Sequence, residues 1–560
     1  MIRQLRMVGV LAALVGLGAC DKQLDVTNPN QPDQGRALAT PGDAENMMGS
    51  YYRRWHDGLY RTLGNVEGMA NMMSFQNYSS LANNCQNQRT PFSGAINDNS
   101  VGNTCGGEQQ RVYFVESEVN RVASTLLKSM EDGLTLGSDA RNNRFKAFGE
   151  FLRGVSLGYL SLIYDSAAVV STGMDAQDAG ALSDYKVVMD SAMAALQAAI
   201  DAANASGSGQ DGFPLPESWI PGPTSMTTTE FIRLVRSYRA RFRANVARTP
   251  AERAAVNWDQ VIADAQNGIT EDHMNTTSTV SGPFRTWMSQ YDRYGLWHQM
   301  PPFVIGMADV SGSYAAWIAT PVGDRGAGNQ GFFMVTPDQR FPQGATRAAQ
   351  QAEFAITSCQ AASTPCKHYF VNRLGSDQFA GVGWGWSNYD FVRFHSWRVS
   401  GDGTGENGNV PMFTKAELDM LEAEGQIRKG NFAAAAALIN KTRTKNGLPA
   451  ITAFDASSPV PGGANCVPKV PVSPFNVIAC GNMMEAMKYE KRLETAYTHF
   501  AAWFLDMRGW GDLPAGSPLF WAVPYQDLQA RGYATGDIYS TGDGVGTAPG
   551  SFAVKGTYGW

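Results

Sequence analysis

The strongest constraint on the fold is a pair of adjacent helical patterns at residues 414–448, TKAELDMLEAEGQIRKGNFAAAAALINKTRTKNGL. Leu418, Leu421 and Gly425 recur at the three- and four-residue spacing of one helix face. Gly430-Asn431 interrupts the pattern as a turn. A second face follows, made of Phe432, Ala436 and Ile439, and Gly447 and Pro449 end it. The stretch therefore predicts a helix, a tight turn and a second helix.

Similar patterns recur along the chain. Apolar residues at helical spacing mark helices near 142–164 and 184–203, a pair within 228–269, and a C-terminal helix near 482–508. Their apolar faces include Phe145, Phe148, Leu152, Val155, Tyr159, Ile163, Val188, Leu196, Ile200, Phe231, Leu234, Tyr238, Phe242, Trp258, Val261 and Ile262.

Paired helices with small residues at the crossing resemble tetratricopeptide repeats, although here they are degenerate and unevenly spaced. Long segments rich in Gly, Pro, Ser and aromatic residues separate them, at 204–226, 270–413 and 449–480. We expect a mainly α fold: a degenerate tetratricopeptide-like helical-repeat scaffold with large loop-rich insertions, the largest at 270–413. Binding residues are often on loops that a rigid scaffold presents.

The N-terminus has the pattern of a lipoprotein signal. Arg3 and Arg6 precede an apolar run at Val8–Leu17, which is too short to span a bilayer as a helix. Leu17-Gly18-Ala19-Cys20 matches a bacterial lipobox, in which Cys20 takes the lipid. We therefore expect a signal peptide at 1–19 and a single lipid-anchored domain at 20–560. The alternative is an ordinary secretory signal with an unrelated cysteine.

Six cysteines remain after Cys20. Proximity in sequence suggests that they form local disulfides, Cys85 with Cys105, Cys359 with Cys366, and Cys466 with Cys480, as an oxidising compartment permits. Metal binding is the alternative, but the chain has no CxxC and no histidine pair at ligand spacing. We expect neither a metal nor a cofactor.

The charge balance argues against nucleic acid as a partner. The 560-residue chain carries a formal net charge of −6 and only 17% charged residues, but 11% aromatic residues. Such a composition favours long, ordered, loop-rich surfaces over a polyelectrolyte-binding surface.

Three aromatic-rich stretches are candidate ligand sites: WGWSNYDFVRFHSWR at 384–398, TWMSQYDRYGLWH at 286–298, and Gln76-Asn77-Tyr78. A flat ring stacks on the C–H face of a sugar, while neighbouring polar groups bind its hydroxyls. The candidate ligand-binding residues are Trp384, Trp386, Tyr389, Tyr294, Trp297 and Tyr78. The alternative is that these aromatics pack the loops onto the scaffold.

No catalytic residue stands out. Glu490, Arg492, Glu494 and Arg508 lie on or near an apolar helix, where opposite charges are most often structural pairs. Gly154–Gly158 fits the GxSxG pattern of a hydrolase, but it lies inside a continuous helical period and not on a strand-to-helix turn. The GxGxxG pattern at 403–408 lacks a surrounding βαβ unit.

Taken in order, four blocks of the chain resemble the SusD/RagB-like nutrient-uptake outer-membrane lipoproteins. They are the lipobox followed by Leu24–Asn30; Phe148–Gly154 running to Tyr164; Ala416–Glu424 with Gly430-Asn431-Phe432; and Tyr489–Glu494 with Trp503–Gly511 and Pro524-Tyr525-Gln526. Two departures are Tyr497-Thr498-His499, where the family often has Glu-Gly, and Met507 in place of a leucine.

The resemblance implies a SusD-like fold and a non-catalytic role. Such a lipoprotein is anchored on the outside of the outer membrane, where it binds a glycan or peptide nutrient and passes it to a TonB-dependent barrel similar to SusC. An alternative function is a helical-repeat lipoprotein that acts as a protein–protein scaffold in the cell envelope, since concave repeat surfaces bind peptides.

Overall fold

The computed structural model describes residues 40–60, 66–79, 99, 106–175, 178–209, 211–277, 298–325, 332–353, 366–373, 385–399, 407–533 and 552–560. The chain divides into two compact units, Met1–Met47 and Met48–Trp560, and the repeats and the loop-rich segments belong to the second. None of the described helices combines the length and the apolar character that crossing a membrane requires.

Helices make up most of the described structure. They are α3 (Pro41–Tyr60), α4 (Val66–Met73), α5 (Gly106–Glu131), α6 (Asp139–Ile163), α7 (Tyr185–Ser206), α8 (Thr228–Asn245), α9 (Pro250–Ala254), α10 (Trp258–Gln266), α12 (Pro302–Ile305), α13 (Ser313–Ala319), α14 (Arg347–Glu353), α15 (His395–Val399), α16 (Lys415–Arg428), α17 (Phe432–Lys445), α18 (Met483–Thr495), α19 (Ala502–Trp510) and α20 (Tyr525–Ala530), with 3₁₀ turns at Gly306–Ala308, Val322–Asp324 and Gly463–Asn465.

The described strands are short and pair in twos, always antiparallel. They are β1 (Tyr78–Ser79) with β5 (His298–Gln299), β2 (Ser166–Ala168) with β3 (Leu182–Asp184), β4 (His273–Thr277) with β8 (Gly408–Phe413), β6 (Phe370–Asn372) with β7 (Tyr389–Phe391), and β9 (Lys469–Val472) with β10 (Val477–Cys480). The prediction of a mainly α fold is therefore confirmed.

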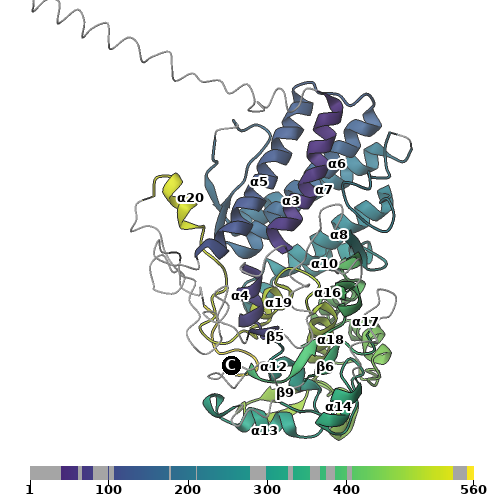
Figure 1. Cartoon of the computed structure of the whole chain (residues 1–560), viewed down its shortest axis with the longest axis vertical. Helices are drawn as coiled ribbons and strands as arrows, with labels where there is room; N and C mark the ends of the chain where they lie inside the picture. The colour runs from purple at the N-terminus through teal and green to yellow at the C-terminus, as the bar shows by residue number, and fades with distance from the viewer. Residues whose placement is uncertain are drawn as a thin grey trace, which may run out of the picture. The chain divides into compact units, whose positions relative to one another are not determined.

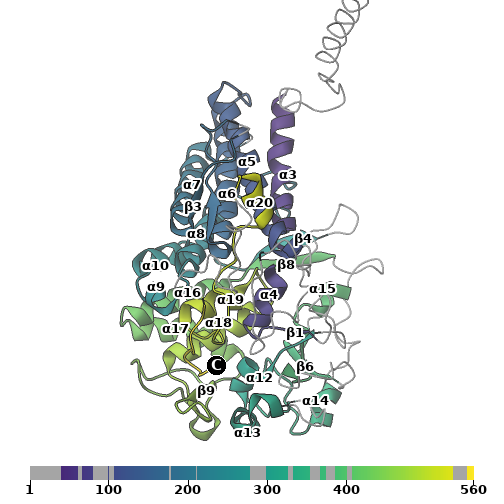
Figure 2. The same ribbon diagram turned by 90° about the vertical axis from the view of Figure 1, so that its left-hand side faces the viewer.

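The predicted repeat helices are present close to their expected bounds, as α6, α7, α8, α10, α16 and α17. Helices α5, α6 and α7 run side by side (Figures 1 and 2). Two glycines of α6 allow its neighbours to approach closely. A Cβ at Gly154 would lie 2.5 Å from the Leu196 side chain of α7, and one at Gly158 would lie 2.2 Å from the Phe242 ring of α8. The GxSxG pattern thus belongs to a helix-packing face, as the helical period predicts.

Two buried ion pairs join successive repeat pairs. Arg241 of α8 forms a bidentate pair with Glu417 of α16, at 2.8 and 2.7 Å, and both side chains are fully buried. Arg253 of α9 binds Glu424 of α16 in the same way, at 3.0 and 2.6 Å. Because a guanidinium and a carboxylate match in this geometry only at one relative placement, the two pairs fix how α16 stacks on α8 and α9.

The C-terminal helix predicted near 482–508 is two helices, α18 and α19, separated at Ala496–Ala501. Tyr497 and Ala501 adopt left-handed backbone conformations with φ of 55° and 52°, which an α-helix cannot accommodate. Tertiary bonds hold the break in place. The Tyr497 hydroxyl donates to the Gln76 carbonyl at 2.7 Å, and the Ala501 N–H donates to the Glu67 carboxylate of α4.

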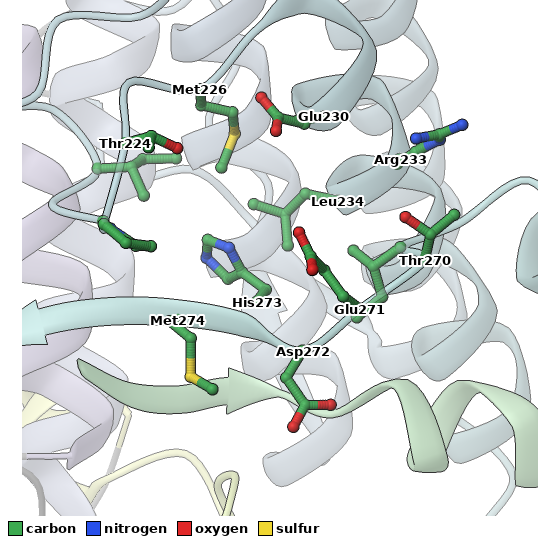
Figure 3. Close-up of a pocket in the computed structure, with 14 residues that line it drawn as sticks. Thr224, Met226, Glu230, Arg233, Leu234, Thr270, Glu271, Asp272, His273 and Met274 are labelled. Atoms are coloured by element: carbon green, nitrogen blue, oxygen red, sulfur yellow. The ribbon is translucent and has the colours of Figure 1, made fainter. Parts of the chain in front are cut away.

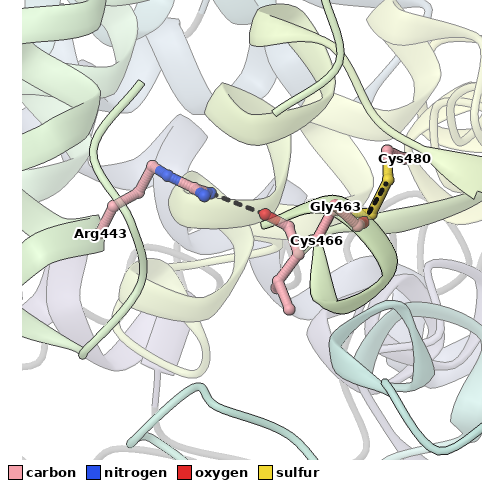
Figure 4. Close-up of a disulfide and its surroundings, with 5 residues drawn as sticks. Arg443, Gly463, Cys466 and Cys480 are labelled. Carbon is pink, nitrogen blue, oxygen red and sulfur yellow. Dashed lines mark hydrogen bonds between the residues drawn. A yellow bond between two sulfur atoms is a disulfide. The ribbon is translucent and has the colours of Figure 1, made fainter. Parts of the chain in front are cut away.

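The segment between α17 and α18 is organised by a disulfide. Cys466 and Cys480 are bonded, with Cα atoms 5.8 Å apart, and this closes the β9–β10 hairpin (Figure 4). Arg443 of α17 donates to the Val467 carbonyl at 2.9 Å, beside the disulfide. Cys366 is also disulfide-bonded. Cys20, Cys85, Cys105 and Cys359 lie outside the described residues.

Candidate ligand-binding site

The described residues of the three aromatic stretches nominated by the sequence lie close together in the fold. Tyr78 pairs with Gln299 and Ser79 with His298, which joins β1 to β5. The N–H of Met300, just after β5, donates to the carbonyl of Tyr389 in β7 at 3.0 Å. We call this place the loop junction, defined as β1, β5 and residues Gly385–Tyr389. It lies where segments more than two hundred residues apart in sequence come into contact.

Gln299 organises the loop junction. Its side-chain oxygen Oε1 accepts the N–H groups of both Ser387 and Asn388 at 2.9 Å. The Ser387 hydroxyl donates to the Met300 carbonyl and accepts the Tyr389 N–H. Asn388 itself has a φ of 62°, a left-handed conformation that asparagine tolerates better than most residues. Hydrogen bonds with Gln299, Met300 and the Ser387 side chain therefore fix the backbone of 387–389.

The nominated aromatic side chains that the structure describes are buried. Tyr389, Tyr78 and Trp386 are 0%, 2% and 4% exposed. The Tyr389 hydroxyl donates to Gln350 of α14 at 2.7 Å, and burial raises the pKa of Tyr389 and of Tyr78 to about 12. As placed, none of the three presents a ring face to solvent, so their observed role is to pack the junction, and ligand contact by them stays a prediction.

The remaining nominated residues, Trp384, Tyr294 and Trp297, lie outside the described residues. In sequence, Trp384 directly precedes Gly385 and Trp297 directly precedes β5, so each is adjacent to a residue of the loop junction. Sequence reasoning missed Gln299 and Gln350, because nothing in a lone glutamine indicates that it will order a distant loop.

A separate pocket of about 260 Å³ lies between the segment before α8, α8 itself and β4. Figure 3 shows His273 of β4 and Leu234 of α8 among the side chains that line it. The pairing of β4 with β8 shifts register between His273 and Met274, and such an irregularity changes the direction of the side chains beside it. Burial lowers the pKa of His273 to about 4, so the imidazole is neutral at physiological pH. The pocket is smaller than a typical small-molecule site.

The C-terminal charges nominated as structural pairs are buried and bonded. Arg340 contacts Glu490 at 2.9 Å and Glu494 at 3.2 Å, Arg492 pairs with Asp512, and Arg508 donates to two backbone carbonyls. Glu490, Arg492 and Glu494 are thus compensated by charges from elsewhere in the fold, as the structural interpretation predicts, whereas Arg508 is bonded to carbonyl oxygens. Among the described residues, no group of three or more His, Cys, Asp or Glu side chains is placed to hold a metal ion.

No protein-family model matches the sequence, and no curated protein matches it. Solved structures do match. A SusD homologue from Parabacteroides distasonis aligns with a TM-score of 0.55 at 12% identity, over 92% of this chain and 97% of that one.

Two further structures give the same result. A SusD superfamily protein from Parabacteroides distasonis aligns with a TM-score of 0.51 at 10% identity, and one from Bacteroides fragilis with 0.50 at 12%. Both alignments cover 88% of this chain and 98% of the other. The chain therefore has the SusD-like fold, and the resemblance drawn from sequence is confirmed at the level of the fold.

Proposed function

We propose that this chain is a lipid-anchored protein of the outer-membrane surface that binds a glycan and passes it to a TonB-dependent barrel without catalysing a reaction. The observation that carries the proposal is the SusD-like fold over most of the chain, together with the lipobox at Leu17–Cys20. A fold alone does not fix a function, so the loop junction supplies the second support.

The loop junction supports ligand capture because hydrogen bonds fix its backbone and because each of the three aromatic-rich segments contains or directly adjoins residues of the junction in the sequence. We propose that Trp384, Tyr294 and Trp297 supply the rings that stack on the sugar, since each belongs to a segment that enters or leaves the junction. Tyr78 and Tyr389, which are buried, would then be packing residues of the junction. This arrangement divides the aromatics nominated from the sequence into ligand contacts and packing residues.

The first experiment is a mild-detergent purification of the lipoprotein from native outer membranes, with its partners identified by mass spectrometry. A TonB-dependent barrel recovered in stoichiometric amount supports delivery to a transporter. Recovery of other envelope proteins without a barrel would favour the protein–protein scaffold instead. A Cys20→Ser variant tests the anchor, because it should leave the membrane fraction if Cys20 carries the lipid.

The second experiment measures binding of oligosaccharides to the purified chain and to Trp384→Ala and Trp297→Ala. Loss of a stacking ring should weaken binding by about tenfold, since aromatic contacts of this kind contribute on the order of 1 kcal/mol or more beyond the buried area. Trp317→Ala serves as a matched control, because Trp317 belongs to α13 and packs edge-on against Phe303. Unchanged affinity in both test variants would exclude these two residues as ligand contacts.

A further inference from the structure

Three buried side chains at or beside the loop junction carry hydrogen-bond donors that have no partner. They are Arg373, Gln299 and Trp386, which are 1%, 2% and 4% exposed. Within the part of the chain that the structure describes, no hydrogen bond is made by Nη1 or Nη2 of Arg373, by Nε2 of Gln299 or by Nε1 of Trp386. Buried donors are nearly always satisfied in folded proteins, so several unsatisfied ones in one place call for an explanation.

These three side chains belong to one small region. The Arg373 N–H, directly after β6, donates to the Asn388 carbonyl at 2.8 Å. Gln299 binds the N–H groups of Ser387 and Asn388, and Trp386 directly precedes Ser387. Each donor-bearing residue is therefore part of the stretch 386–388 or bonded to it. We call the three side chains the donor cluster.

The orientation of the Gln299 amide is fixed by its own bonds. Because Oε1 accepts two backbone N–H groups, the NH₂ group occupies the other end of the amide and can only donate. The guanidinium of Arg373 and the indole N–H of Trp386 can likewise only donate. The unpartnered atoms of the donor cluster thus form a set without an acceptor.

Charged side chains lie close to Arg373. The Oδ2 atom of Asp390 lies 2.9 Å from the Nε atom of Arg373, and both side chains are buried. Arg347 of α14 brings a second positive charge close by, because it donates to Asn372, the residue before Arg373, at 3.1 Å. The region thus combines unpartnered donors with two cationic side chains, Arg373 and Arg347, and the carboxylate of Asp390.

We propose that the donor cluster binds an anionic group of the ligand, a carboxylate or a sulfate, so that the nutrient is an acidic glycan. A carboxylate or sulfate offers only acceptors and matches a donor-only set, whereas a neutral sugar hydroxyl also brings a hydrogen that would find no acceptor there. The inference rests on the proposed function, since it names the class of nutrient.

The test compares three oligosaccharides of equal length by isothermal titration calorimetry on the whole mature chain. They are an oligogalacturonate, which carries carboxylates, a chondroitin sulfate oligosaccharide, which adds sulfates, and a neutral galacto-oligosaccharide. We expect at least one acidic ligand to bind about tenfold or more tightly than the neutral one. Binding of the oligogalacturonate assigns a carboxylate as the bound group, because it carries no sulfate, whereas binding of the chondroitin sulfate alone assigns a sulfate.

Two variants connect the binding to the donor cluster. Trp386→Phe removes one N–H and keeps the ring, and it should weaken binding of the acidic ligand several-fold with little change in the thermal unfolding midpoint. Arg373→Lys keeps the charge and removes the planar fork, and it should weaken binding about tenfold. Arg54→Lys is the matched control, because Arg54 forms an ion pair with Glu118 in which both side chains are about two-fifths exposed.

The outcomes separate the inference from the proposed function. If the neutral ligand binds as tightly as the acidic ones, the inference fails and glycan capture stands. If both donor-cluster variants bind the acidic ligand as the unmodified chain does, the inference also fails. If no oligosaccharide binds but an acidic peptide does, both the inference and the glycan part of the proposed function are overturned.

Discussion

The buried charges around Arg340 lead to a sharp prediction about stability. Arg340 is 1% exposed, and its guanidinium contacts three carboxylates. It lies 2.8 Å from Asp338, 2.9 Å from Glu490 and 3.2 Å from Glu494. Replacing Arg340 with Met keeps most of the volume and removes the cation, so three buried carboxylates lose a shared partner.

The expected cost follows from the burial of these groups. Breaking a buried ion pair by removing one partner destabilises a protein by about 3–5 kcal/mol, because the remaining charge stays buried without compensation. The matched control is Arg54→Met, whose guanidinium binds Glu118 through similar contacts of 2.6–3.2 Å but is 41% exposed. An exposed pair contributes only about 0.2–1 kcal/mol.

The assay is urea unfolding followed by circular dichroism, on a non-lipidated Cys20→Ser chain that carries each variant. Arg340→Met should lower the free energy of unfolding several times more than Arg54→Met. Adding Glu490→Gln to Arg340→Met should restore about 0.5–3 kcal/mol, since it removes one of the uncompensated charges. The reasoning is refuted if Arg340→Met costs no more than Arg54→Met.

Three further predictions follow from single contacts. Gly158→Ala should cost about 1–3 kcal/mol of stability because its Cβ would lie 2.2 Å from the Phe242 ring. Gly173→Ala, with open space around it, should be close to neutral. Equal melting temperatures of the two variants would contradict this prediction. Burial raises the pKa of Glu67 from about 4.5 in the unfolded chain to about 8 in the folded chain. The folded state therefore binds this proton more tightly than the unfolded state does. The stability that the proton contributes is fully present below pH 4.5 and is lost as the pH rises through 8. Glu67→Gln should therefore gain on the order of 3–5 kcal/mol relative to the unmodified chain between pH 4.5 and pH 8 in urea unfolding, and a pH profile that keeps its shape would exclude a protonated Glu67. Tyr389→Phe removes the 2.7 Å hydrogen bond to Gln350 and should cost about 1 kcal/mol without changing glycan affinity; a drop in affinity measured by calorimetry would instead make Tyr389 a ligand contact.

The repeat helices could be predicted from sequence because their apolar residues recur with the helical period and because clear start and stop signals bound them. The pattern at 414–448 gave the bounds of α16 and α17 within about a residue. Helices α3 and α5 were not anticipated. In α5, for example, Val112, Val119 and Leu126 are buried, but Phe114 is 39% exposed, which blurs the apolar face of the helix in the sequence.

The break between α18 and α19 could not be predicted because its cause is tertiary. The bonds from Tyr497 and Ala501 reach Gln76 and Glu67, more than four hundred residues earlier in the sequence. The same holds for the candidate site. The aromatic stretches were visible in the sequence, but Gln299 and Arg373 acquire their importance only from the backbone groups that the fold brings to them.

The buried charges and the candidate site are linked through one strand. The carbonyl of Arg340 accepts the N–H groups of Tyr369 and Phe370 at 2.8 and 3.0 Å, which fixes the start of β6, and β6 leads directly to Arg373. Arg393 follows the end of the partner strand β7 by two residues, and its guanidinium donates to the Glu494 carbonyl of α18 at 2.9 Å.

The start of β6 is therefore bonded to Arg340, which pairs with α18, and the segment after β7 is bonded to α18 directly. Directional bonds of this kind fix a register more tightly than apolar packing does, because a shift of one residue would leave several buried charges unpaired. Arg340→Met should consequently weaken acidic-glycan binding as well as stability, when affinity is measured at a temperature where the variant is still folded by circular dichroism. Arg253→Met removes an equally buried cation at the interface of α9 and α16, so it should reduce stability and leave affinity unchanged. If the two variants lose affinity equally, the position of β6 does not depend on the charges of α18.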